Sequence, residues 1–176
     1  MDNIQQKLIN VKNEIPQNIR LVAVSKYHPA EAILEAYNAG QRIFGENKAQ
    51  EMKAKHEVLP KDIQWHFIGH LQSNKIKYII SYVSMIEAVD TYKLLSEINQ
   101  HAEKVDRIVP CLLEIHLAKE ETKFGFDFQE CRNFLEEEHW RELKNITIAG
   151  IMGMASNIDD ENQILREFIS LKKFFD

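Results

Sequence analysis

The chain has 176 residues, of which 44% are hydrophobic, enough for one domain with a sizeable core. Its 22 basic and 27 acidic residues give a net charge of −5, and no block of Lys or Arg is present, which argues against a nucleic-acid-binding protein. No apolar run approaches the roughly 20 residues of a membrane-spanning helix, and the N-terminus lacks a signal-peptide core, so we expect a cytoplasmic protein that does not associate with membranes.

The first predicted elements are a helix, a strand and a second helix. Residues 2–14 have helical spacing, and Pro16 ends this helix. The continuous apolar run Leu21–Val24 predicts a strand that is buried on both faces. Pro29 is a favoured first residue of the helix that follows, and Gly40 is a natural residue for its C-terminal cap.

This strand–helix unit recurs along the chain. Further strands are expected around residues 42–45, 63–68, 85–89, 108–117 and 146–152. Further helices are expected across 47–57, after Ser73 as N-cap, after Asp90 as N-cap, across roughly 127–138, and from about Asp159. The predicted strands start near residues 21, 42, 63, 84, 108 and 146.

Alternating strands and helices predict a parallel sheet with right-handed crossovers in one domain over residues 1–176. Periodicity leaves two architectures open, an open doubly wound sheet and a (β/α) barrel. A closed barrel of eight units usually needs about 250 residues, so the chain is short for one. In both architectures ligands bind at the carboxyl ends of the strands.

Lys26 is the most informative residue at these strand ends. Because strand side chains alternate, Val22, Val24 and Lys26 share one face. If that face points into a barrel, desolvation disfavours the ammonium form and makes the amine a nucleophile that can form a Schiff base. The alternative is a strand-end lysine that extends into water.

Other reactive residue types give weaker signals. His66 and His70 would lie about 13 Å apart if one strand held both, too far to chelate one metal ion. No dinucleotide fingerprint, Walker motif or nucleophile elbow is present. Cys111 and Cys131 are too few for a disulfide framework, and we interpret both as packing residues.

Five strand-end segments together resemble one family. They are Leu21–Lys26 (LVAVSK), Phe44–Asn47 (FGEN), Trp65–Lys75 (WHFIGHLQSNK), Lys123–Phe126 (KFGF) and Gly150–Ala155 (GIMGMA). The eleven-residue segment Trp65–Lys75 is unusually specific. In this order they are similar to the motifs of the pyridoxal-phosphate homeostasis protein family, which is related to the N-terminal barrel of alanine racemase.

The resemblance implies a fold-type-III, TIM-type barrel that holds pyridoxal 5′-phosphate (PLP) as a Schiff base on Lys26. It also implies that Val24 and Asn47 line the cofactor and that Met154 lies near its ring. The family is described as binding PLP in vitamin B6 homeostasis, without established catalytic turnover. Many relatives carry an aromatic residue where this chain has Lys48, which puts only the local loop packing in doubt.

A larger departure follows the sixth predicted helix. Relatives continue with a strand ending Met-Gly-Met-Ser and a last strand ending Arg-Ile-Gly-Thr, which supply the main phosphate contacts. We therefore expect about six of eight strand–helix units plus an N-terminal helix, and weaker PLP affinity than in a complete relative. Two unpaired sheet edges would also favour self-association.

Two other functions stay open at this point. One is a PLP-dependent amino-acid racemase, which needs an acid–base group on each face of the substrate carbon. The other is a PLP-independent Schiff-base lyase or a phosphosugar-binding barrel, which needs only Lys26 and a pocket.

Overall fold

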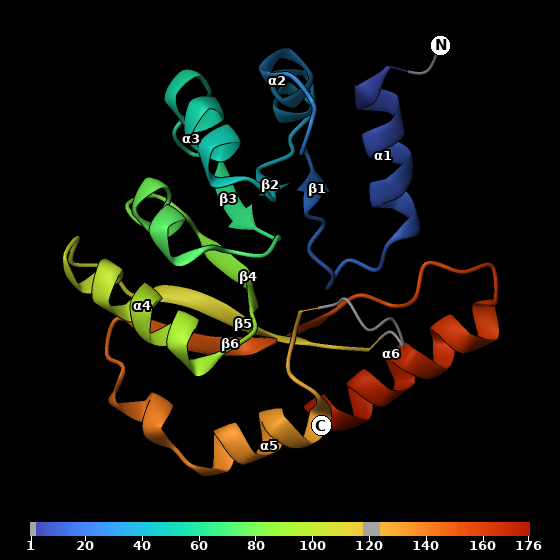
Figure 1. The fold of residues 1–176 in the computed structure, drawn as a ribbon. Helices are drawn as coiled ribbons and strands as arrows, with labels where there is room; N and C mark the ends of the chain where they lie inside the picture. The colour runs from blue at the N-terminus through green and yellow to red at the C-terminus, as the bar shows by residue number, and fades with distance from the viewer. Residues whose placement is uncertain (1–2, 118–123) are drawn as a thin grey trace.

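Strands and helices alternate along the chain in the computed structural model, which describes residues 3–117 and 124–176 (Figure 1). The strands are β1 (Ala23–Val24), β2 (Ile43–Glu46), β3 (Gln64–Phe67), β4 (Met85–Val89), β5 (Val109–Ile115) and β6 (Ile146–Gly153). The α-helices are α1 (Ile4–Glu14), α2 (Ala30–Asn38), α3 (Ala49–Val58), α4 (Tyr92–Glu103), α5 (Phe128–Glu136) and α6 (Glu161–Phe175). Two 3-10 helices are η1 (Ser73–Tyr78) and η2 (His139–Glu142).

The six strands form one parallel sheet in the order β1-β2-β3-β4-β5-β6. Each strand therefore lies beside the strand that precedes it, whereas a doubly wound sheet reverses direction at a switch point. The sheet curves with its helices on the outside, and β1 and β6 form its two edges (Figure 1). The order decides between the two predicted architectures in favour of the barrel type, present here as six consecutive units.

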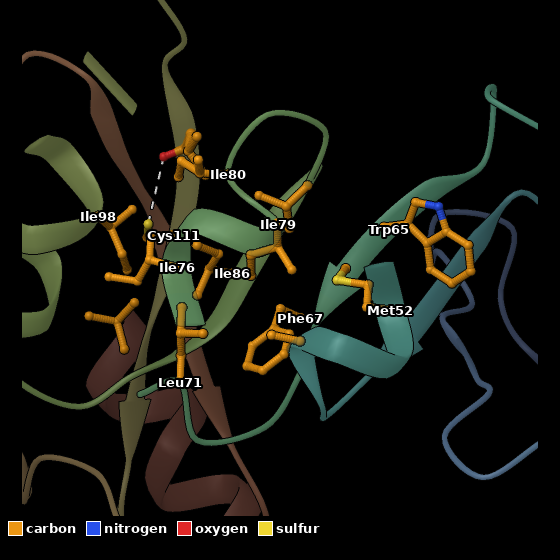
Figure 2. Close-up of a cluster of buried hydrophobic side chains, with 14 of the residues drawn as sticks. Met52, Trp65, Phe67, Leu71, Ile76, Ile79, Ile80, Ile86, Ile98 and Cys111 are labelled. Atoms are coloured by element: carbon orange, nitrogen blue, oxygen red, sulfur yellow. Dashed lines mark hydrogen bonds between the residues drawn. The ribbon is translucent and has the colours of Figure 1, made fainter. Parts of the chain in front are cut away.

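The main hydrophobic core lies between the outer face of this sheet and the helices. Trp65, Phe67 and Ile86 point outward from β3 and β4, and they are completely or almost completely buried. Figure 2 shows them in one cluster with Met52 of α3, Ile98 of α4 and the isoleucines of η1 and the turn after it. Burial of apolar surface at this scale fixes the curvature of the sheet and hence the positions of the strand ends.

The first strand differs from its prediction. The run Leu21–Val24 was expected to be buried on both faces, but only Ala23–Val24 is a strand, and Val24 is 51% exposed. The physical reason is that β1 is an edge strand, with β2 as its one partner among the described residues. The buried Gln41 side chain holds the preceding segment instead, because its Nε2 donates to the carbonyl oxygens of Leu21 and Ile43 at 2.8 and 2.7 Å.

Two helix predictions also need correction. The helix expected after Ser73 is the six-residue 3-10 helix η1 and a turn, although its apolar stripe Ile76, Ile79, Ile80 and Val83 is buried as the spacing indicates. The N-cap of α4 is Thr91 and not Asp90, because the Thr91 Oγ1 accepts a hydrogen bond from the Leu94 N–H at 3.2 Å.

The last helix leaves much of its apolar face open. Leu165, Phe168 and Phe175 of α6 are all exposed, while Leu171 is half-buried against the core. Within residues 3–117 and 124–176, no helix is long and apolar enough to cross a membrane.

The open β1 edge predicts self-association. A mostly apolar groove beside it is lined by Ile4, Val24, Ile33 and Phe44, among others. We expect the apparent mass in sedimentation velocity to rise with protein concentration, because an exposed edge pairs readily with another chain. Val24→Lys should weaken this association, whereas Val58→Lys, at a position 73% exposed on α3, should leave it unchanged. A single monomeric species at all concentrations would contradict the prediction.

Candidate functional site

Lys26 lies directly after β1, at the carboxyl end of the sheet. The ladder continues to its neighbour, because the Ser25 N–H donates to the Gly45 carbonyl oxygen at 2.9 Å. A Cβ atom built on Gly45 would lie 3.2 Å from Val22 Cγ1, so Val22 and position 45 share the inner face of the sheet. Alternation then assigns Val24 and Lys26 to this face as well, and Lys26 is half-buried.

Asn47 follows β2, the strand next to the one that carries Lys26. A Cβ atom on Gly69 would lie 2.6 Å from Asn47 Cβ and 2.9 Å from Asn47 Cα, so position 69 has no room for a side chain. The Asn47 Oδ1 is buried and has no hydrogen-bond partner in the described part of the chain. This oxygen could accept a hydrogen bond from a ligand without giving up another bond.

Met154 lies at the opposite edge of the sheet. It follows β6, is 58% exposed, and is separated from Lys26 by the whole strand order from β1 to β6. The structure therefore places Val24, Lys26 and Asn47 on neighbouring strands and Met154 on a strand that is not paired with theirs. Lys123, the first residue of the fourth motif, lies outside the described residues.

Two histidines near the strand ends pair with carboxylates. His66 Nδ1 lies 2.5 Å from Glu87 Oε1, and His70 Nδ1 lies 3.2 Å from Asp90 Oδ2. His70 is not in a strand, because β3 ends at Phe67. Across the described residues, no group of three or more His, Cys, Asp or Glu side chains could hold a metal ion.

Glu114 adds a buried carboxyl group on β5. Burial raises its pKa above the ordinary value and Asp90 raises it further, while His70 and His116 oppose that shift. The Nε2 atom of His116 is also buried without a partner among the described residues. These side chains make the middle strands of the sheet polar at their carboxyl ends.

The two cysteines do not belong to the site. Both are buried free thiols, and burial raises the pKa of Cys111 to about 12 and that of Cys131 to about 11. A thiol with so high a pKa carries little nucleophilic thiolate at neutral pH. Their interpretation as packing residues agrees with this environment.

Sequence reasoning missed a buried charged group behind Lys26. The Lys55 Nζ lies 2.7 Å from Glu46 Oε1 and 2.7 Å from Glu51 Oε1, and Glu46 is completely buried. Burial raises the pKa of Glu51, but hydrogen bonds from Lys55 and from the Tyr27 N–H lower it more, so that it is lower than usual. The i,i+4 spacing of Glu51 and Lys55 on one helix was a signal that could have found this pair.

The close contact at Gly69 generates a prediction for the site. Gly69→Ala should displace Asn47, because the new methyl group would meet both the side chain and the backbone of that residue. We expect a loss of about 1–3 kcal/mol in the free energy of unfolding, measured by urea denaturation. The control is Gly40→Ala, where no atom lies within 4 Å and only the positive φ of +89° opposes a side chain. A free energy of unfolding left unchanged by Gly69→Ala would contradict the close contact between Gly69 and Asn47.

Comparison with known proteins identifies similar chains that cover most of this one. The family model described as "Alanine racemase, N-terminal domain" matches residues 1–176. The pyridoxal phosphate homeostasis protein of Schizosaccharomyces pombe is 37% identical over 163 residues, which cover 89% of this chain and 68% of the relative.

Solved structures give the same result for the fold. PipY of Synechococcus elongatus, solved with PLP bound, aligns with a TM-score of 0.87 and 32% identity, over 98% of this chain and 80% of PipY. Alanine racemase of Clostridium difficile 630 aligns with a TM-score of 0.79 over 99% of this chain and 46% of the enzyme. Its identity is only 15%, so this second likeness concerns the fold alone.

Proposed function

The chain belongs to the pyridoxal phosphate homeostasis protein family, and we propose that it binds PLP as a Schiff base on Lys26 and serves vitamin B6 homeostasis without catalytic turnover of its own. One observation carries the proposal. Lys26 stands half-buried at the carboxyl end of the first strand, on the inner face of a barrel-type sheet. PipY, which shares this fold at 32% identity, is a PLP-bound structure.

The described side chains fit such a ligand. The Lys26 amine adds to the aldehyde carbon of PLP, a C=N bond replaces the C=O bond, and the oxygen leaves as water. The exposed apolar surface of Val24 offers contact to a flat ring, and the unpartnered Asn47 Oδ1 offers an acceptor on the neighbouring strand. When bound, PLP supplies an electron sink, whereas the protein supplies binding and orientation.

Met154 has a different place in the proposal. It follows β6, the edge strand opposite β1, so a ligand at Lys26 would meet it from the other end of the strand order. We propose that it covers the ring from that side. Val24, Lys26 and Asn47 hold the ligand from neighbouring strands.

The first experiment tests Lys26 directly. Purified chain is mixed with PLP and reduced with borohydride, and the modified lysine is identified by peptide mass spectrometry. We expect the visible absorbance of the Schiff base and a reduced label at Lys26, both lost in Lys26→Ala. Lys53→Ala, which removes an exposed lysine of α3, is the matched control and should retain both.

Two outcomes would change the proposal. A band of the same intensity in Lys26→Ala would overturn it. Addition of L-alanine to the loaded chain, followed by chiral chromatography, checks the racemase alternative. D-Alanine formed by the wild-type chain and absent with Lys26→Ala would replace the non-catalytic role with an enzymatic one.

A second prediction concerns retention of PLP. In barrels, phosphate groups are commonly held by the loops after strands 7 and 8, through backbone N–H groups and a helix N-terminus. The described residues form six strands, so we expect the 176-residue chain to hold PLP less tightly than the S. pombe relative. Equilibrium dialysis measures the affinity of both proteins for PLP. Pyridoxal lacks the phosphate, so the two proteins should differ less in their affinity for pyridoxal. Equal affinity of the two proteins for PLP would contradict this prediction.

A further inference from the structure

The backbone on both sides of Lys26 is tied to the buried charged group of α3 and β2. On one side, the Ser25 carbonyl oxygen accepts a hydrogen bond from Lys55 Nζ at 2.8 Å, and the Ser25 Oγ donates to Glu46 Oε1 at 2.6 Å. On the other side, the Tyr27 N–H donates to Glu51 Oε1 at 2.8 Å. We call Glu46, Glu51 and Lys55 the Lys26 clamp.

The hydrogen bonds of Lys55 use its full donor capacity. An ammonium group has three N–H donors, and Lys55 directs them to Ser25 O, Glu46 Oε1 and Glu51 Oε1 at 2.7–2.8 Å. Its side chain is only 8% exposed, so no water need complete the set. Charge-assisted bonds with this geometry, shielded from solvent, hold their partners more firmly than neutral bonds do.

The clamp lies on the opposite side of the strand from the Lys26 amine. Alternation directs Ser25 toward the helix layer, where it is buried beside Glu46, and directs Lys26 toward the inner face. The clamp therefore does not occupy the space in which a ligand would sit. It can act on Lys26 only through the backbone of residues 25–27.

The conformation of Tyr27 explains why such an anchor is required. Its φ of +66° lies in the left-handed region, which is unfavourable for a residue with a side chain. Conformations of this kind persist where the surroundings fix them, often at functional sites. Two hydrogen bonds hold this one: Glu51 Oε1 accepts the Tyr27 N–H, and the Ser25 carbonyl oxygen accepts the His28 N–H at 3.1 Å.

We propose that Glu46, Glu51 and Lys55 are positioning residues for Lys26, holding its backbone so that the amine meets the aldehyde of PLP in a reactive orientation. The inference rests on the proposed function of Lys26. A nucleophile fixed in the orientation of attack reacts faster than one that must find it, and a displacement of about 1 Å can slow a reaction by about 100-fold.

Glu51 is the residue to change, because its side chain is partly exposed and lies in the first turn of α3. Glu51→Ala removes the acceptor for the Tyr27 N–H, and we expect Schiff-base formation at Lys26 to slow by about tenfold or more. Glu51→Gln retains an Oε1 acceptor and should restore most of the rate. Val58→Ala, on the same helix and 73% exposed, should not change it.

The measurement is the rate of labelling at Lys26. Samples are quenched with borohydride at a series of times, and mass spectrometry gives the labelled fraction of Lys26 relative to that of Lys53. A purely structural role for Glu51 would change the two lysines alike. Unfolding curves of each variant show whether the fold is retained.

A second measurement tests the clamp without PLP. Hydrogen exchange of the Tyr27 amide should be slow in the wild-type chain and faster by about tenfold or more in Glu51→Ala. Rapid exchange in the wild type would overturn the clamp even if the variant did not fold. Equal labelling rates of Lys26 in wild type and Glu51→Ala would also overturn it, whereas no label at Lys26 in the wild type would instead overturn the proposed function.

Discussion

Each strand of the sheet must satisfy two different environments, because successive side chains point to opposite faces. On the outer face of β3, Trp65 and Phe67 pack against the helices, while on its inner face His66 pairs with Glu87. Directly after β1, the same rule separates Ser25, which is buried toward α3, from Lys26, which it assigns to the inner face. The outer face of the sheet thus contributes to stability, while the inner face holds the residues proposed to bind a ligand.

The parallel register extends this alternation of faces from one strand to the next. Val24 is level with Gly45, and Gly45 with His66, so the carboxyl ends of neighbouring strands meet at one level. Val24 and Gly45, and likewise Gly45 and His66, are 21 positions apart in the chain and become neighbours at this level. The site depends on this register, since a shift of one residue would turn Lys26 toward the helices.

Much of the fold could be predicted because strands that bury a face, and helices that pack on them, have strong periodic patterns. The six strands begin within a few residues of their predicted starts, and Lys26 lies at the strand end where the alternation assigns it. The pattern could not reveal that β1 is an edge, because the run Leu21–Val24 is apolar whether or not a further strand covers it. It also could not distinguish an α-helix from the shorter η1, since both bury the same isoleucines.

The candidate site was predicted less completely. Periodicity locates residues on elements, but the approach of Gly69 to Asn47 and the pairing of Glu46 with Lys55 depend on how separate units pack. Met154 belongs to the same set of motifs, and it follows β6, which is not paired with the strand that precedes Lys26. Contacts between units follow from tertiary packing, which a single sequence does not display.

The saturated hydrogen bonding of Lys55 has a consequence for chemical selectivity. Lys55 donates to the carbonyl oxygen of Ser25, the residue before Lys26, so both lysines belong to this part of the fold. An aldehyde reacts with an amine only through a free lone pair. As an ammonium that donates to three acceptors, Lys55 presents none. Under the proposal for Lys26, Lys55 is therefore the lysine that we expect to stay unmodified, because its three N–H donors are paired and its side chain is buried.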